Sequence, residues 1–105
     1  MTRHVIIWTL KDEYSAEEKK TIKAGIKEAL EGLRGKIPGL VDIRVRTEGL
    51  ASSNGEVMLD SLFEDEEALK GYAVHPLHCA AANEKVRPFT KIRSCFDFEQ
   101  ESDEP

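Results

Sequence analysis

Hydrophobic positions along the chain follow a period of two in four segments and helical spacing in the segments between them. Residues 3–10 (RHVIIWTL) predict a strand with His4, Ile6, Trp8 and Leu10 on one face and other apolar residues on the opposite face. Further strands with alternating apolar positions are predicted at residues 40–47, 56–63 and 91–98.

Helix signals separate these strands in the order β-α-β-β-α-β. Ser15 and Glu18 have the spacing of a capping box, and the helix that follows is predicted to stop at Gly35. Asp65 is a good N-cap for a second helix. Pro76 would break the interior of that helix, so we expect it to begin a new helical piece over about residues 76–84.

This order predicts an α+β fold, a ferredoxin-like monomer with two helices on one face of a four-stranded sheet. The other face would then carry a bare apolar patch made of Val5, Ile7, Met58 and Leu62. Monomeric proteins rarely expose such a patch. We therefore predict a homodimer in which a second identical subunit covers this face.

Composition sets further limits. The 105 residues fit one domain, placed at 1–98 and followed by an acidic tail at 99–105 that we expect to be frayed. The formal net charge of −5 argues against nucleic acid as a partner. No apolar run is long enough for a membrane span, and the N-terminus does not resemble a signal peptide, which favours the cytoplasm.

The chemistry-bearing side chains are concentrated in residues 72–78 (YAVHPLH). Tyr72 and His78 can donate and accept protons. In one uninterrupted helix, six positions would turn the two side chains about 240° apart, so only a bend at Pro76 would bring them together. The alternative is structural: Tyr72 packs in the core, and His78 bonds to nearby backbone. We expect His75 to cap the new helix.

His75 and His78 also have a spacing that can place two imidazoles near one metal ion. A third ligand would have to come from His4, Cys79 or a carboxylate, and zinc sites in proteins have three or four protein ligands. No such set is visible in the sequence, so we expect no metal site and no cofactor.

Several segments together resemble the Dabb family, the stress-responsive A/B barrel domains of the dimeric α/β barrel group. The resemblance covers residues 3–98 and is carried by RHVIIWTLK, the Ile37-Pro38-Gly39 turn, LFEDEEAL at 62–69, YAVHPLH at 72–78 and the closing FDF at 96–98. It implies that two ferredoxin-like sheets pair face to face. It also implies a pocket in each subunit between its own sheet and helices.

One branch of this family contains a plant polyketide cyclase that needs no cofactor, and there the residues matching Tyr72 and His78 carry the chemistry. The resemblance implies a pocket lined by His4, Ile6, Trp8, Val57, Leu59, Phe63, Tyr72 and His78. The sequence departs from the cyclase at Val57, which replaces a pocket histidine, and at the small residues Ala81 and Ala82.

Three functions remain open at this point. The first is a domain that binds a small, mostly apolar molecule between sheet and helices. The second is a cofactor-free enzyme, cyclase-like or lyase-like, with His78 as base and Tyr72 as proton donor. The third is a purely structural dimer whose core side chains fill the space. Pocket size separates the third function from the first two.

Overall fold

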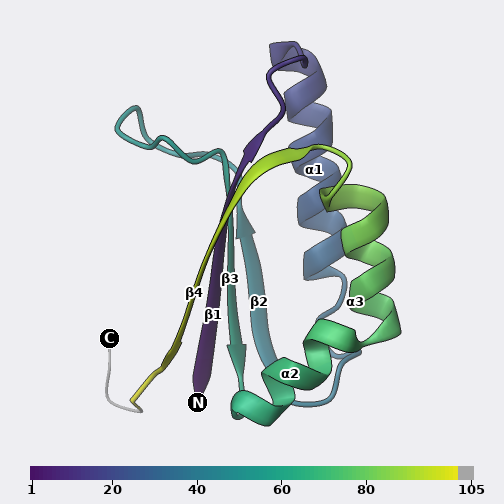
Figure 1. Ribbon diagram of the computed structural model, residues 1–105, viewed down its shortest axis with the longest axis vertical. Coiled ribbons are helices and arrows are strands. Elements are labelled where there is room, and N and C mark those ends of the chain that lie inside the picture. The colour runs from purple at the N-terminus through teal and green to yellow at the C-terminus, as the bar shows by residue number, and fades with distance from the viewer. Residues whose placement is uncertain (102–105) are drawn as a thin grey trace.

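Four antiparallel strands form one sheet in the order β2-β3-β1-β4, and all helices lie on one side of it (Figure 1). The structure is a computed structural model that describes residues 1–101. The elements in chain order are β1 (Thr2–Leu10), α1 (Ala16–Glu31), β2 (Leu40–Arg46), β3 (Val57–Phe63), α2 (Glu66–Val74), α3 (Pro76–Ala81), the π-helical segment η1 (Ala82–Val86) and β4 (Thr90–Glu99). The predicted ferredoxin-like α+β fold is confirmed.

The predicted capping box starts α1. The Ser15 side chain accepts a hydrogen bond from the Glu18 N–H, and the Glu18 carboxylate accepts one from the Ser15 N–H. The expected stop at Gly35 is wrong, because α1 already ends at Glu31. Gly32 is its C-cap and donates its N–H to the Glu28 carbonyl. Gly35 lies in the turn that follows, with φ of 79°.

The sheet face under the helices forms the core. His4, Ile6 and Trp8 on β1 pair with Ser61, Leu59 and Val57 on β3, so opposite partners face the same side. Large side chains that are fully buried against this face include Phe63, Tyr72, Ile26 and Leu30. Burial of this apolar surface between the sheet and the helices is what stabilises a domain of this size.

The opposite face of the sheet has no helix over it (Figure 1). Ile7 on this face is 40% exposed, and Met58 and Leu62 are partly exposed. Strand β4 extends the apolar surface, because Phe96 pairs with Val5 and is 68% exposed. We call this surface the open face and define its apolar part as Val5, Ile7, Met58, Leu62, Ile92, Phe96 and Phe98.

The two ends of the chain lie side by side. Thr2 pairs with Glu99 in the sheet, and the Gln100 N–H donates to the Met1 carbonyl at 2.8 Å. Glu99 and Gln100 are therefore tied to β1, although the tail was expected to begin at residue 99. Residues 102–105 of that tail lie outside the described residues. No helix among the described residues is long and apolar enough to cross a membrane.

Candidate functional site

The site begins at a break between two helices. Helix α2 ends at Val74, and His75 is extended, with φ of −66° and ψ of 134°. Pro76 is the first residue of α3, where its missing N–H leaves no bond unmade. The His75 Nδ1 atom accepts a hydrogen bond from the Leu77 N–H at 3.1 Å. The predicted break and the predicted histidine cap are both present.

This break brings Tyr72 and His78 together. Their ring centroids are 4.2 Å apart with an interplanar angle of 35°. The His4 ring lies edge-on to Tyr72, with centroids 6.2 Å apart. The bend at Pro76 thus overcomes the divergence that a continuous helix would impose. Side chains from α2, α3 and β1 share one site.

The three rings line a cavity of about 100 Å³ between the sheet and the helices. Ile6, Trp8 and Leu59 form part of its walls, as the sequence predicted. The rest of the lining is Leu30, Ala82, Val86, Arg87, Thr90 and Arg93. Apolar walls with a few polar groups are the composition of small-molecule sites, and a volume below the roughly 300–1,000 Å³ of drug-sized pockets suits only a small molecule.

Two predicted wall residues lie elsewhere. Phe63 is fully buried beneath the cavity, with its ring centroid 5.0 Å from that of Tyr72. It supports the Tyr72 ring. Val57 is buried near the end of β3 that joins the preceding loop, and it contributes to a different cavity. Both share the helix-covered face with the site, but their positions along that face keep them out of the lining.

The Tyr72 hydroxyl is a buried polar group with no hydrogen-bond partner among the described residues, and Tyr72 as a whole is only 1% exposed. Burial raises the pKa of this hydroxyl well above its ordinary value. The group therefore stays protonated at neutral pH and can donate one hydrogen bond. An unpaired buried hydroxyl costs free energy, which an added hydrogen-bond acceptor would recover.

His78 is partly exposed and is held by the backbone. Its Nδ1 atom lies 3.3 Å from the Ala73 carbonyl oxygen, which can only accept, so Nδ1 carries the proton. Burial lowers the pKa of His78, the hydrogen bond to the Ala73 carbonyl opposes this shift, and the nearby Arg87 and Arg93 charges add to the lowering. At neutral pH the imidazole is therefore uncharged, and its Nε2 lone pair can accept a proton.

A second cluster forms where β1 meets β4. His4 pairs with Asp97 in the sheet, and its Nδ1 atom lies 2.5 Å from the Asp97 carboxylate. The Cys95 sulfur lies 3.5 Å from the same carboxylate and 4.0 Å from His4 Nδ1. Burial and the Asp97 carboxylate raise the pKa of Cys95.

These nitrogen, sulfur and oxygen atoms all lie within 4.8 Å of one another, so within residues 1–101 His4, Cys95 and Asp97 are the set that could hold a metal ion. The spacing in the sequence had indicated His75 and His78 as the candidate pair instead. In the structure the His75 ring caps α3, because its Nδ1 atom accepts the hydrogen bond from the Leu77 N–H. His4 was considered only as an addition to that pair, because the β1–β4 register was not known.

Arg87 and Arg93 are the charged residues of the lining that the sequence did not predict. Arg87 follows η1, and Arg93 pairs with Trp8 across β1 and β4. The alternation of β4 could have indicated Arg93, since Arg93, Cys95 and Asp97 share the face opposite the apolar one. Arg87 carries no such signal, because it lies in an irregular segment after the last helix.

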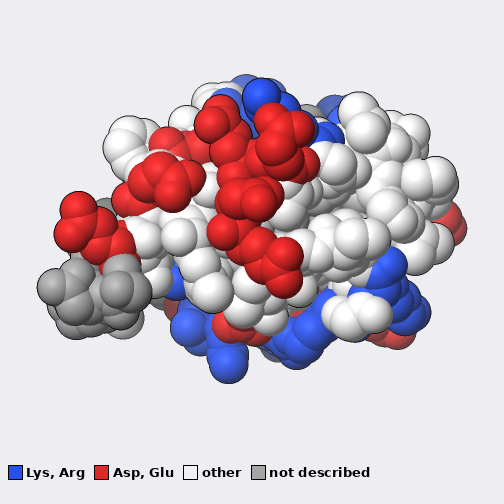
Figure 2. Space-filling view, turned by 90° about the horizontal axis from the view of Figure 1, so that it is seen from below, with Lys and Arg blue, Asp and Glu red and all other residues white. Residues whose placement is uncertain are grey.

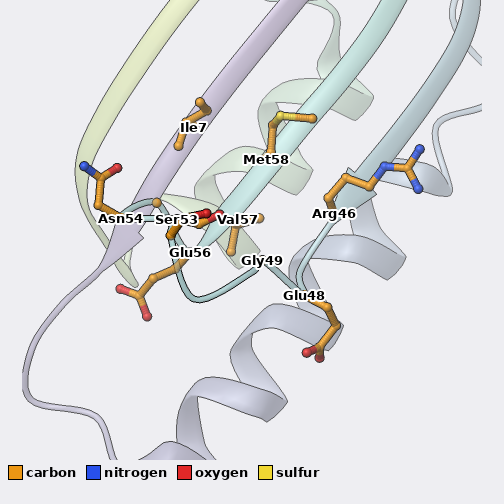
Figure 3. A pocket seen from close by; sticks show the side chains of 11 residues that line it. Ile7, Arg46, Glu48, Gly49, Ser53, Asn54, Glu56, Val57 and Met58 are labelled. Atoms are coloured by element: carbon orange, nitrogen blue, oxygen red, sulfur yellow. The ribbon is translucent and has the colours of Figure 1, made fainter.

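A larger cavity of about 320 Å³ lies on the open face, under the loop that joins β2 to β3 (Figure 3). Ile7, Arg46 and Met58 contribute side chains from three neighbouring strands, and the loop residues from Glu48 to Glu56 close one side. Gly55 comes so near the strand that an added Cβ would lie 2.4 Å from the Ile7 side chain. Tyr72 and the three histidines do not line this cavity.

Comparisons with known proteins agree with the fold. A family model described as the stress responsive A/B barrel domain, Dabb, matches residues 2–100. A comparison with curated proteins gives no match. Among solved structures, a dimeric protein of unknown function with a ferredoxin-like fold from Bacteroides fragilis is 30% identical, with 94% of this chain and 95% of that chain covered and a TM-score of 0.86.

Two more distant structures share the fold. A Dabb family protein from Mesorhizobium loti is 21% identical, with 96% of this chain and 97% of that chain covered and a TM-score of 0.72. Hydroxynitrile lyase from Passiflora edulis is 15% identical, with 99% and 96% covered and a TM-score of 0.71. The match of the family model over nearly the whole chain, together with the described fold, shows that this chain belongs to the stress responsive A/B barrel domain (Dabb) family.

Proposed function

We propose that the protein binds a small, mostly apolar molecule with a hydrogen-bond acceptor in the cavity between its sheet and helices. The unpartnered Tyr72 hydroxyl carries this proposal. A ligand oxygen placed in the cavity would accept its hydrogen bond, while Ile6, Trp8 and Leu59 would surround an apolar body. The open volume counts against a purely structural dimer with a filled core.

Acetophenone, an apolar ring with one carbonyl acceptor, is a suitable first probe. We expect a titration followed by ¹H–¹⁵N NMR to shift amide signals of α2, α3 and β1 most. Tyr72→Phe should weaken binding about 3–10-fold, because it removes one hydrogen bond worth about 0.5–1.5 kcal/mol. Tyr14→Phe, which changes a partly buried tyrosine packed on Phe89, is the matched control. Equal affinity of wild type and Tyr72→Phe would contradict the proposal.

A second function, a cofactor-free cyclase-like or lyase-like enzyme, is favoured by the contact between Tyr72 and His78. In such a reaction His78 Nε2 takes a proton from the carbon next to a carbonyl. The electron pair of the broken C–H bond moves to the carbonyl oxygen, which accepts a hydrogen bond from Tyr72. The lowered pKa of His78 and the raised pKa of Tyr72 keep the base uncharged and the donor protonated.

Deuterium exchange into the methyl group of acetophenone in D₂O tests this step without requiring the natural substrate. A general base contributes roughly 10²–10⁴ to a rate, so His78→Ala should slow exchange by about 10²-fold or more. Lys20→Gln, an exposed change on α1 outside the cavity, is the control. If His78→Ala keeps its fold and exchanges deuterium at the wild-type rate, the enzymatic proposal is wrong and the binding proposal is unaffected.

We further propose that the protein is a homodimer through the open face. The Bacteroides fragilis relative is described as dimeric. In this chain the patch of Val5, Ile7, Met58 and Leu62 continues onto β4 through the exposed Phe96. A second copy would remove this apolar surface from water, which favours association. The cavity under the β2–β3 loop would then lie at the dimer interface.

A further inference from the structure

Two positively charged side chains stand at the entrance of the site. Arg87 and Arg93 line the cavity and are exposed, whereas Tyr72 at the same cavity is buried. The exposed arginines therefore mark the mouth of the cavity, and the buried Tyr72 lies deeper. The walls between them are mostly apolar, with Ile6, Trp8 and Leu59 contributed by the sheet.

Within residues 1–101, neither arginine forms an ion pair with a carboxylate. Arg87 donates to the neutral side-chain oxygen of Asn83. By contrast, Arg3, Arg34 and Arg44 all form ion pairs with aspartates. The chain has 20 acidic and 15 basic residues, so carboxylates are not scarce. Two guanidinium groups at one cavity are thus left with charge that no described side chain neutralises.

The charge distribution of the surface sharpens this contrast. Figure 2 shows acidic side chains gathered on the end of the molecule that is lowest in Figure 1, the end that holds α2, and Glu66 and Glu67 lie in the first turn of that helix. These carboxylates stabilise the N-terminus of α2 through its dipole. The cavity mouth has the opposite sign, and the pKa of His78 responds to both arginines. A positive mouth on an acidic protein favours entry and retention of an anion.

We propose that the ligand is a small monocarboxylic acid with an apolar body, bound as the carboxylate. Arg87 and Arg93 hold the carboxylate at the mouth, because guanidinium groups match the geometry of two carboxylate oxygens. The apolar body lies against Trp8 and Leu59, and a second acceptor on the ligand can reach the Tyr72 hydroxyl. This assignment rests on the proposed binding function and adds a charge requirement to it.

The test compares benzoate with acetophenone, which have similar size and differ in charge. At pH 7.5, where His78 is uncharged, we expect benzoate to bind at least about tenfold more tightly, because hydrogen bonds to charged groups are stronger than neutral ones. Raising the salt concentration should weaken benzoate binding and leave acetophenone binding nearly unchanged. NMR titration measures both affinities on the same sample.

Variants assign the preference to the two side chains. Arg93→Gln and Arg87→Gln should each reduce benzoate affinity several-fold and reduce acetophenone affinity much less, so the ratio of the two affinities falls. Lys20→Gln, which removes one exposed positive charge from α1, is the control and should change neither affinity. Arg93→Lys keeps the charge without the planar fork and should retain only part of the preference.

The outcomes separate this inference from the proposed function. Equal binding of benzoate and acetophenone would overturn the carboxylate assignment while leaving the cavity as a binding site. A benzoate preference that survives both Arg→Gln changes would also overturn it. If neither probe binds, the inference fails together with the proposed function. Circular dichroism of each variant verifies that the fold is retained.

Discussion

Replacing Tyr72 by phenylalanine should make the unliganded protein more stable while impairing its site. The hydroxyl is buried and has no partner among the described residues, so the folded state bears its desolvation cost. That cost is roughly 1–3 kcal/mol for a neutral polar group. The phenylalanine ring keeps the contact with Phe63, whose centroid is 5.0 Å away, and leaves only a small void.

We expect the free energy of unfolding to rise by about 1 kcal/mol, the lower part of that range, because removal of the oxygen also sacrifices some packing. For a domain of this size, 1 kcal/mol corresponds to an increase in Tm of roughly 4–8 °C. Urea unfolding gives the free energy directly if the slope with denaturant is unchanged. Protein concentration must be fixed, because association stabilises the folded state.

A second tyrosine, Tyr14, provides the control for this prediction. Tyr14→Phe changes a hydroxyl on a partly buried ring and should alter stability by less than about 0.5 kcal/mol. A loss of 1 kcal/mol or more in Tyr72→Phe would mean that the hydroxyl is hydrogen-bonded in the unliganded protein. The reason for expecting a ligand acceptor at Tyr72 would then disappear.

Three other predictions follow from the geometry. The pKa of His78 is lowered from its ordinary value of 6.5, so near that pH the unfolded state binds more protons than the folded state. The free energy of unfolding should therefore fall as the pH drops from 7 to about 5.5. Urea titrations should show that His78→Gln reduces this dependence on pH. Gly39→Ala should reduce the free energy of unfolding by more than about 2 kcal/mol, because the added Cβ would lie 2.4 Å from the Ala68 Cβ and φ is 79°. Gly35→Ala has the same φ but nothing within 4 Å of the added Cβ, so it should reduce that free energy by about 1–2 kcal/mol. Thermal unfolding compares the two variants. Phe96→Glu should shift sedimentation at micromolar concentration from dimer to monomer, because it places a charge on the open face, and an unchanged dimer would assign the interface elsewhere.

Local rules predicted most of the fold because each acts over a few residues. The alternation in residues 3–10 assigned His4 and Trp8 to the covered face, and the structure buries both. Asp65 caps α2 as expected, accepting a hydrogen bond from the Ala68 N–H at 2.8 Å. The end of α1 was placed too late, because Gly32 closes the helix before Gly35 is reached. Helix ends are less well determined than helix periods.

Residues that meet across the sheet could not be predicted in the same way. His4 and Asp97 are 93 positions apart in sequence, and only the register of β1 against β4 brings them together. Alternation defines which face a residue occupies, but it defines neither the register of two strands nor the place of the helices above them. For this reason Phe63 and Val57 were assigned to the right face but do not line the cavity.

The break between α2 and α3 holds the side chains of the site in place, while one hydrogen-bonding group of the site, the Tyr72 hydroxyl, has no partner among the described residues. Pro76 and the His75 cap fix the angle between α2 and α3, and the Tyr72 ring is held between Phe63 and His78. The groups are thus positioned before any ligand arrives, which lowers the entropic cost of binding. Only the Tyr72 hydroxyl, among the buried side-chain polar atoms of the described chain, lacks a partner. Because the fold satisfies its other buried polar atoms, the free energy cost of the unpaired Tyr72 hydroxyl is concentrated at the one residue that a ligand acceptor is proposed to reach.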